Sequence, residues 1–297
     1  MPVQQGAGAD DNDKARASAH FIFLGDSMVQ FSGKVAVITG AGSGIGRALA
    51  QQLAARGCRL ALADVNQQGL EETAASLPQP VLLKRLDVAD REAVYAFAEE
   101  VRATYGTAHF VINNAGVSVS QTIAEQSYED FEWLMGINFW GVVYGTKAFL
   151  PMLTAQNEGT IVNLSSVFGI VAVPTQGSYN ASKFAVRGFT ECLRHELDAT
   201  KVNVVCVHPG GIRTNIAKSS RYYAGPDGSS DQARAVQQFE KLTMTTPAKA
   251  AATIIRGIER GSARVLIGPD AHLITFIQRC FPVHYWRLMK LSLGFVK

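Results

Sequence analysis

A tyrosine and a lysine one helical turn apart, Tyr179 and Lys183, are the residues of this sequence best suited to chemistry. Residues at i and i+4 share a helix face, so these two side chains lie close together. A neighbouring ammonium stabilises phenolate and lowers the pKa of a tyrosine from about 10 toward the physiological range. Such a tyrosine can donate a proton to a ketone oxygen or accept one from an alcohol. Ser166, which ends a predicted strand, could place a hydroxyl at the same substrate oxygen. Taken alone, the pair also fits a half-buried tyrosine beside a lysine stem.

A glycine-rich segment at 39–46 predicts a phosphate-binding loop. It joins an apolar β-branched run at 34–38, typical of a buried parallel strand, to a helical pattern at 47–56. Glycines let the backbone approach a pyrophosphate closely, and free N–H groups at a helix N-terminus attract anions. An ordinary turn is a poor explanation, because the glycines are concentrated at a strand–helix junction.

Asp64 favours NAD over NADP as the bound dinucleotide. It ends the second predicted strand, and an acid at this distance from a glycine loop accepts hydrogen bonds from the diol of an adenosine ribose. The same carboxylate repels a 2′-phosphate. Neither Ser43 nor Val65, which flank the expected ribose pocket, supplies a cation for that phosphate. A surface acid at the end of a strand is the alternative.

Strands and helices alternate along the rest of the sequence. Further strands are predicted at 59–64, 81–86, 109–112, 160–164, 202–207 and 264–267, and further helices at 66–76, 90–105, 131–153, 179–199 and 247–260. This alternation implies right-handed βαβ units. The sequence therefore predicts an α/β fold with a doubly wound, seven-stranded parallel sheet (Rossmann-like) in a single domain.

Most polar or glycine-rich features directly follow a predicted strand. Besides the loop at 39–46, they are Asp64, Asp87, the segment 113–116, Ser166 and the pair Pro209 and Gly210. Ligands of such sheets bind beyond the carboxyl ends of the strands, so these residues are expected to surround one site.

These motifs, in this order, resemble the short-chain dehydrogenase/reductase family. The matching segments are TGxxxGxG at 39–46, NNAG at 113–116, Ser166, YxASK at 179–183 and PGxxxT at 209–214. The resemblance covers residues 29–268. It implies that Tyr179 is the general acid/base, that Lys183 lowers its pKa and holds the nicotinamide ribose, and that Ser166 orients the substrate oxygen. Asn138 falls where the family has a fourth catalytic residue, which anchors a water of the proton relay to Lys183.

The resemblance also implies a set of cofactor-binding residues. Asp87 and Val88 are expected beside adenine, residues 114–116 along the cofactor channel, and Ile212 with Thr214 at the carboxamide. The full set is Gly40, Ser43, Gly44, Ile45, Gly46, Asp64, Asp87, Val88, Asn114, Ala115, Gly116, Tyr179, Lys183, Pro209, Gly210, Ile212 and Thr214. Asp87 and Asn114 also have simpler explanations, as an acid before a helix and a turn former.

The segment 217–246 lies where the family has its substrate loop. Long loops in compact domains often act as lids. Its apolar residues, and those after Ser166, could line a pocket or merely cover the core: Tyr222, Tyr223, Phe239, Met244, Phe168, Val171 and Val173. We expect a hydrophobic secondary alcohol or ketone, steroid- or lipid-like, as substrate.

The composition excludes several classes of function. A net charge of +3 over 297 residues is near balance and argues against a nucleic-acid partner. Four cysteines without a CxxC pair predict a reduced, cytoplasmic protein, and the histidines lack the spacing of a metal site. No apolar run reaches the roughly 18 residues that a membrane span needs.

Both ends of the chain differ from the core sequence. Residues 1–27 are expected to be a disordered or artificially added extension, with Met28 as a candidate natural start, before a domain at 28–268. Residues 269–297 form a basic amphipathic extension that could lie on a membrane or pack on its own subunit or across an oligomer interface. By resemblance, the helices at 131–153 and 179–199 should build a homodimer or homotetramer.

Two other functions stay open at this stage. An NADP-dependent carbonyl reductase would share the same catalytic residues, although Asp64 argues against it. A non-catalytic dinucleotide-binding scaffold could use the same fold. The intact set of Asn138, Ser166, Tyr179 and Lys183 favours an enzyme.

Overall fold

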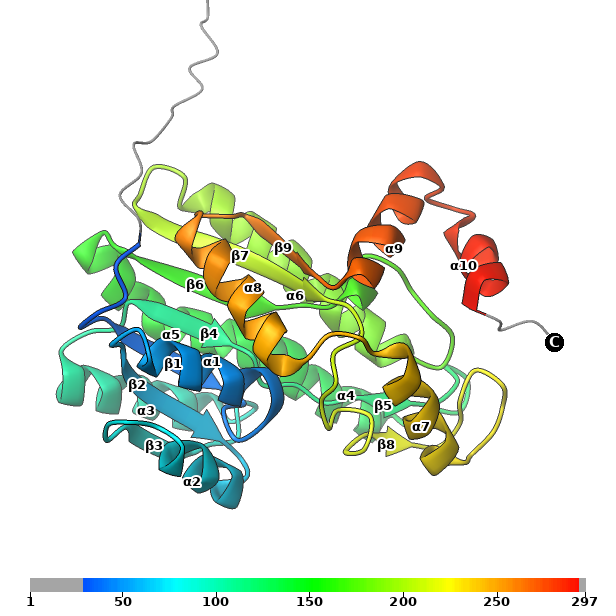
Figure 1. Ribbon diagram of the computed structural model, residues 1–297, viewed down its shortest axis with the longest axis horizontal. Coiled ribbons are helices and arrows are strands. Elements are labelled where there is room, and N and C mark those ends of the chain that lie inside the picture. The colour runs from blue at the N-terminus through cyan, green and yellow to red at the C-terminus, as the bar shows by residue number, and fades with distance from the viewer. Residues whose placement is uncertain (1–28, 294–297) are drawn as a thin grey trace, which may run out of the picture.

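Seven parallel strands form one sheet through the centre of the protein (Figure 1). The structure, a computed structural model, describes residues 29–293, so the expected extension at 1–27 and the candidate start at Met28 lie outside the described residues. The strands are β1 (Val35–Thr39), β2 (Arg59–Asp64), β3 (Leu82–Arg85), β4 (Phe110–Asn113), β6 (Gly159–Leu164), β7 (Val202–Pro209) and β9 (Arg264–Ile267). Their order, β3-β2-β1-β4-β6-β7-β9, confirms the predicted doubly wound, Rossmann-like domain.

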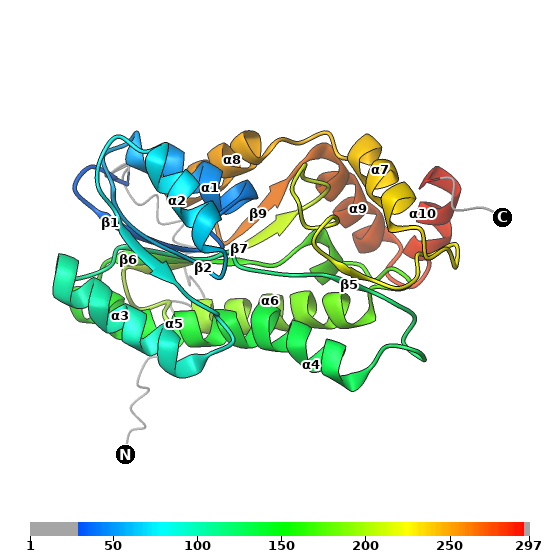
Figure 2. The same cartoon turned by 90° about the horizontal axis from the view of Figure 1, so that it is seen from below.

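Helices cover both faces of this sheet (Figure 2). One face carries α1 (Gly44–Ala54), α2 (Gln67–Ala75) and α8 (Pro247–Glu259); the other carries α3 (Arg91–Tyr105), α4 (Tyr128–Met135), α5 (Gly141–Gln156) and α6 (Gly177–Glu196). Successive side chains of a strand point to opposite faces, so Ala36 and Ile38 join one buried cluster while Val35 and Val37 join the other. This is why the first four residues of β1 are all apolar.

Side-chain caps begin the helices where the sequence predicts them. The carboxylate of Asp90 accepts a hydrogen bond from the Ala93 N–H at 3.0 Å and starts α3. Thr246 does the same for α8, with Pro247 in the first turn.

The helix predicted at 131–153 is interrupted. It begins as α4, passes through a π-helical turn at Gly136–Trp140 and continues as α5 to Gln156. The extra residue in a π turn shifts the following side chains around the helix axis, and such turns are frequent at functional sites. Asn138 lies in this turn and is fully buried.

The segment 217–246 is not the continuous loop that the sequence suggested. It contains β8 (Arg221–Tyr222), which pairs in parallel with β5 (Val119–Ser120), and the helix α7 (Gln232–Leu242). Asp231 starts α7 by accepting a hydrogen bond from the Arg234 N–H at 2.9 Å.

Two helices follow the last strand, α9 (Pro269–Cys280) and α10 (Tyr285–Leu293), with Pro282 between them. They lie beyond the carboxyl ends of β7 and β9 (Figure 1). Among residues 29–293, no helix combines the length and apolar character that crossing a bilayer requires.

Candidate active site

Ser166, Tyr179 and Lys183 meet beyond the end of β6. Ser166 follows that strand, and the other two residues lie in the first turns of α6. The side chains of Tyr179 and Ser166 share a hydrogen bond. The buried Lys183 Nζ donates to the Leu164 carbonyl at 3.0 Å and lies 5.6 Å from the centroid of the Tyr179 ring. The three residues therefore place two hydroxyl groups and an ammonium around one point.

Burial governs the protonation of this group. Burial raises the pKa of Tyr179, and the hydrogen bond with Ser166 opposes the rise. Burial lowers the pKa of Lys183 to about 8, so the amine remains mostly charged at neutral pH. The lowering of the Tyr179 pKa expected from the sequence is thus not found, because desolvation of the phenol dominates. In addition, the Lys183 ammonium donates its hydrogen bond to the Leu164 carbonyl rather than to the Tyr179 hydroxyl.

Asn138 lies near these three residues and is hydrogen-bonded to the segment that follows β4. Its Oδ1 accepts a hydrogen bond from the Val117 N–H at 2.8 Å, and its Nδ2 donates to the Val117 carbonyl at 2.9 Å. A Cβ atom on Gly116 would lie 3.2 Å from Asn138 Oδ1 and 3.5 Å from Lys183 Nζ. Gly116 therefore lies against both residues. The π turn brings all four predicted catalytic residues to one site.

His208 lies behind Ser166 and was not singled out from the sequence. It is fully buried in β7, next to β6, and its Nδ1 is 2.9 Å from the Ser166 carbonyl oxygen. Because that partner only accepts, the Nδ1 atom carries the proton. Its Nε2 has no hydrogen-bond partner among the described residues. Burial lowers the pKa of His208 to about 4, so the ring is neutral at physiological pH. The sequence signal that could have revealed this residue is a histidine directly after a largely apolar predicted strand.

The glycine loop has the geometry of an anion site. Gly40 and Gly44 have φ values of +66° and +53°, which side chains rarely adopt. A Cβ on Gly40 would lie 2.8 Å from the Ala115 Cα, so the loop packs directly on the segment after β4. Ser43, the N-cap of α1, makes no side-chain hydrogen bond to the first turn of the helix, which includes Ile45. The backbone N–H groups of this first turn therefore remain available, and they suit the pyrophosphate of a dinucleotide.

Asp64 is tied to this loop. Its Oδ2 accepts from the Gly42 N–H at 2.8 Å and its Oδ1 from the Asn66 N–H at 2.9 Å. Its side chain remains partly exposed. Lone pairs therefore remain on the carboxylate for a ribose diol.

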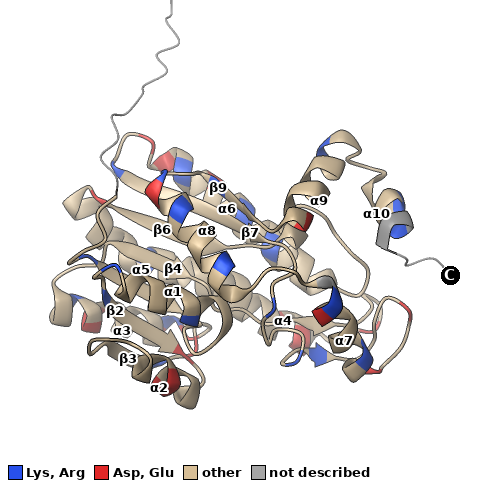
Figure 3. Ribbon diagram, in the orientation of Figure 1, with Lys and Arg blue, Asp and Glu red and all other residues tan. Residues whose placement is uncertain are grey.

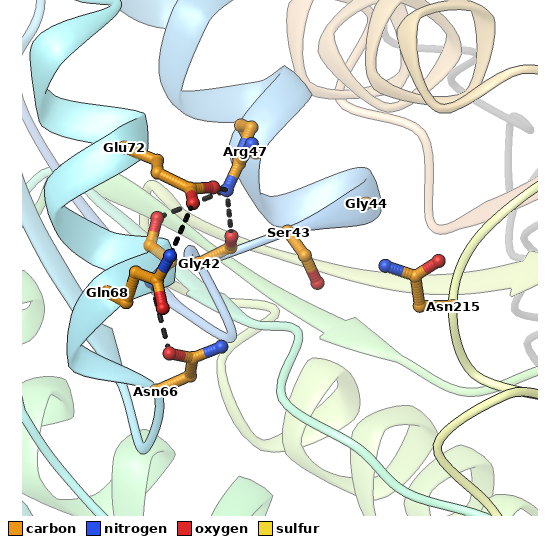
Figure 4. Close-up of a pocket in the computed structure, with 9 residues that line it drawn as sticks. Gly42, Ser43, Gly44, Arg47, Asn66, Gln68, Glu72 and Asn215 are labelled. Atoms are coloured by element: carbon orange, nitrogen blue, oxygen red, sulfur yellow. Dashed lines mark hydrogen bonds and ion pairs between the residues drawn. The ribbon is translucent and has the colours of Figure 1, made fainter.

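Arg47, which the sequence motifs do not include, lines a hollow beside the glycine loop, together with Ser43 and Asn66 (Figure 4). Its guanidinium donates to the carbonyl of Gly42 and, at 2.8 Å, to the carboxylate of Glu72. It thereby joins the loop to α2. Asn215 lines the hollow opposite Ser43 (Figure 4).

Several predicted cofactor-binding residues direct their side chains elsewhere. Val88 is buried against the start of α5 at Gly141, and Ile212 is buried in the core. Their backbone atoms alone can serve a ligand. The amide of Asn114 donates to the carbonyls of Thr39 (2.9 Å) and Gly40 (3.1 Å) and so holds β1 to β4.

Asp87, by contrast, is exposed beyond β3, where its Oδ1 accepts from the Ala89 N–H at 2.9 Å. This position leaves the carboxylate accessible to a ligand.

The turn after β7 faces the glycine loop. Thr214 lies close to Gly44, where an added Cβ would be 3.2 Å from the Thr214 methyl carbon. Pro209 ends β7. The next residue, Gly210, packs so closely on the Asp270 carboxylate that a side chain at position 210 would clash with it. The carboxylate of Asp270, in the first turn of α9, accepts from the Gly211 N–H at 2.6 Å. Asp270 thus fixes this turn, a long-range contact that the sequence pattern does not reveal.

The segment after Ser166 forms an apolar wall with α10. Phe168 meets the Tyr179 ring edge to face at 6.1 Å between centroids. Val171 is buried in a cluster with Met289 of α10, and partly buried Val173 packs on the same cluster.

The predicted pocket residues of 217–246 lie differently. Tyr223 and Met244 are largely exposed, Phe239 is half-buried, and the Tyr222 hydroxyl donates to the Ser229 carbonyl at 3.2 Å. The structure therefore supports the wall beside Phe168 more strongly than a pocket lined by this segment.

The family follows from comparison with known proteins. The sequence profile described as short chain dehydrogenase matches residues 34–223. The chain belongs to the short-chain dehydrogenase family. The motifs at 39–46 and 179–183 had predicted this membership, which is confirmed.

Relatives of this short-chain dehydrogenase are named as oxidoreductases. It is 48% identical over 267 residues to a Mycobacterium tuberculosis protein named as the oxidoreductase SadH, covering 88% of this chain and 96% of SadH. It is 30% identical over 275 residues to human estradiol 17-beta-dehydrogenase 11, covering 91% of this chain and 86% of that protein.

A crystallised short-chain dehydrogenase/reductase from Burkholderia phymatum, in complex with NAD, superimposes with a TM-score of 0.79 at 32% identity, over 85% of this chain and 95% of that one. We conclude that this short-chain dehydrogenase is itself an oxidoreductase.

Proposed function

We propose that this short-chain dehydrogenase transfers hydride between NAD(H) and a secondary alcohol or ketone, with a preference for hydrophobic substrates. The observation that carries the proposal is the hydrogen-bonded pair of Tyr179 and Ser166 with the buried Lys183 beside it. This group lies at the same edge of the sheet as the glycine loop, where an α/β sheet binds its ligands.

The protein's own residues would handle the proton. In ketone reduction, Tyr179 donates its phenolic proton to the carbonyl oxygen, which the Ser166 hydroxyl holds in place; in alcohol oxidation, Tyr179 accepts the hydroxyl proton. Lys183 stabilises the phenolate formed in reduction through its positive charge. Asn138 fixes Val117 and would hold the water that returns the proton. NAD(H), when bound, accepts or supplies the hydride at this site.

Two features support NAD rather than NADP. The Asp64 carboxylate lies at the glycine loop, where it would repel a 2′-phosphate. Arg47 is one nearby cation, but it forms an ion pair with Glu72 at 2.8 Å and donates to the backbone carbonyls of Gly42 and Gly69. The NAD complex of the Burkholderia phymatum relative agrees with this preference.

The hydrophobic substrate is inferred from the wall after Ser166. The Phe168 ring lies against the Tyr179 ring, and partly buried Val173 packs on the cluster of Val171 and Met289, so the apolar wall runs from Tyr179 toward α10. One relative is named as an estradiol dehydrogenase, which agrees with a steroid- or lipid-like substrate.

A paired absorbance screen tests this proposal. Purified full-length protein is offered NADH or NADPH with steroidal ketones, long-chain ketones and small polar carbonyl compounds, and NAD with the matching alcohols. We expect turnover with NAD(H) and apolar substrates. Preference for NADPH would support the alternative carbonyl reductase. Equal turnover of small polyols and apolar alcohols would refute the hydrophobic preference. Cofactor binding without any turnover would support a scaffold.

A further inference from the structure

The C-terminal helices expose a group of large apolar side chains. They occupy the outer side of α9, the turn around Pro282 and the start of α10, and are between 37% and 81% exposed: Leu273, Phe276, Phe281, Val283 and Leu288. Leu273 and Phe276 are three residues apart and therefore neighbours on α9. We call these five residues the C-terminal apolar surface. A soluble protein rarely exposes so many large apolar residues together unless they meet a partner or a membrane.

Positively charged residues lie on the same two helices as this surface. Arg279 lies in the last turn of α9, and Arg287 and Lys290 lie on α10; all three are exposed, and none forms an ion pair within residues 29–293. Figure 3 shows these cations on both helices and acidic colour only at the start of α9. That acid, Asp270, is engaged with the Gly211 N–H at 2.6 Å.

We propose that the C-terminal apolar surface docks on a bilayer that contains anionic lipids. Apolar side chains would enter the boundary between headgroups and acyl chains, while Arg279, Arg287 and Lys290 would meet lipid phosphates and carboxylates. A second copy of this chain is a poorer occupant. A symmetric dimer would bring each patch against itself and place like charges together.

The two helices form a firm platform for such docking. Asp270 anchors the start of α9, and Ile274 packs toward the cluster that contains Val171 and Met289. The Tyr285 hydroxyl accepts a hydrogen bond from the Ala172 N–H at 2.9 Å and so holds α10 to the segment after Ser166. The docked surface therefore lies next to the apolar wall of the active site. An apolar substrate dissolved in the bilayer would reach the protein on this side.

Vesicle flotation with the full-length protein tests the proposal. The probes are vesicles of phosphatidylcholine alone and of phosphatidylcholine with one quarter phosphatidylserine. We expect binding to the anionic vesicles that weakens with salt. The variant Arg279→Gln/Arg287→Gln/Lys290→Gln should bind them on the order of 100-fold more weakly, since each cation near such a surface contributes roughly fivefold. The variant Phe276→Ser/Phe281→Ser should lose at least about tenfold through lost apolar insertion.

Matched variants control for general effects. Lys201→Gln/Lys249→Gln/Arg260→Gln removes the same charge from exposed cations elsewhere. Ile123→Ser/Tyr95→Ser removes exposed apolar residues that are distant in sequence from the patch and outside α4, α5 and α6. Both controls should bind like the parent protein.

Absence of binding to anionic vesicles would overturn the proposal, as would equal losses in patch and control variants. Weaker self-association of the patch variants, without vesicle binding, would assign the surface to a protein contact instead. These readouts do not depend on turnover, so they stand apart from a failure of the proposed NAD(H) activity.

Discussion

Replacement of His208 by asparagine should make folding stability less sensitive to acid. The pKa of His208 in the native protein is about 4, because burial disfavours its charged form. In the unfolded chain a histidine has a pKa of about 6.5. Above that higher value both states are neutral and His208 causes no pH dependence. As the pH falls below it, the unfolded state binds the proton first and the native state loses relative stability. The loss levels off once the native ring also titrates, near about 4.

The size of this effect follows from the two pKa values. A gap of roughly two and a half units corresponds to about 3 kcal/mol in full, of which about 2 kcal/mol falls between about pH 7 and about pH 5. The parent protein should therefore lose about 2 kcal/mol more unfolding free energy over that interval than His208→Asn does. Asparagine also lowers stability at neutral pH by removing packed atoms, but this term is the same at both pH values and cancels.

Urea unfolding at the two pH values measures the difference. His272→Asn, at an exposed position, is the matched control and should behave like the parent. The reasoning fails if His208→Asn and the parent lose the same stability on acidification. A fall in turnover of His208→Asn, with substrate KM little changed, would show in addition that the imidazole positions Ser166 through its carbonyl.

Three further predictions concern the cofactor, the catalytic residues and assembly. Asp64→Asn should lower the preference for NAD over NADP in kcat/KM by about tenfold, since one repelling charge is removed at a partly exposed site; an unchanged ratio would show that Asp64 does not meet the ribose. Gly116→Ala should reduce kcat by about tenfold or more while melting stays close to that of the parent, because its methyl group would press on Asn138, which lies beside Lys183; unaltered kcat would refute this contact. We also predict a dimer through α4, α5 and α6; α4, α6 and the π turn between α4 and α5 expose aromatic rings, so Trp140→Glu in that turn should shift sedimentation toward the monomer; a monomeric parent protein would exclude this interface.

The sequence was informative where local patterns decide the structure. Apolar runs within 59–64 and 264–267 coincide with the observed strands β2 and β9, because the buried positions of a strand in a covered sheet are apolar. Asp90 and Pro247 mark helix starts through contacts with residues only a few positions away, so their local sequence was sufficient.

Features that depend on distant contacts were missed. The π turn at Asn138 and the pairing of β5 with β8 have no local signature, because a single added residue or a two-residue strand leaves no periodicity. The roles of Arg47 and Asp270 depend on partners brought close by folding. The pKa of Tyr179 depends on burial, which spacing along a helix does not report.

The central claim, that Tyr179 transfers the substrate proton, is tested most directly by Tyr179→Phe. NADH binding, followed by fluorescence titration, and single turnover with the best ketone of the screen are measured on the same preparation. The account predicts a Kd for NADH within about twofold of the parent and a hydride-transfer rate lower by a factor of at least about 100, within the range that general acid catalysis supplies. A Tyr179→Phe enzyme that reduces the ketone at nearly the parental rate would contradict it.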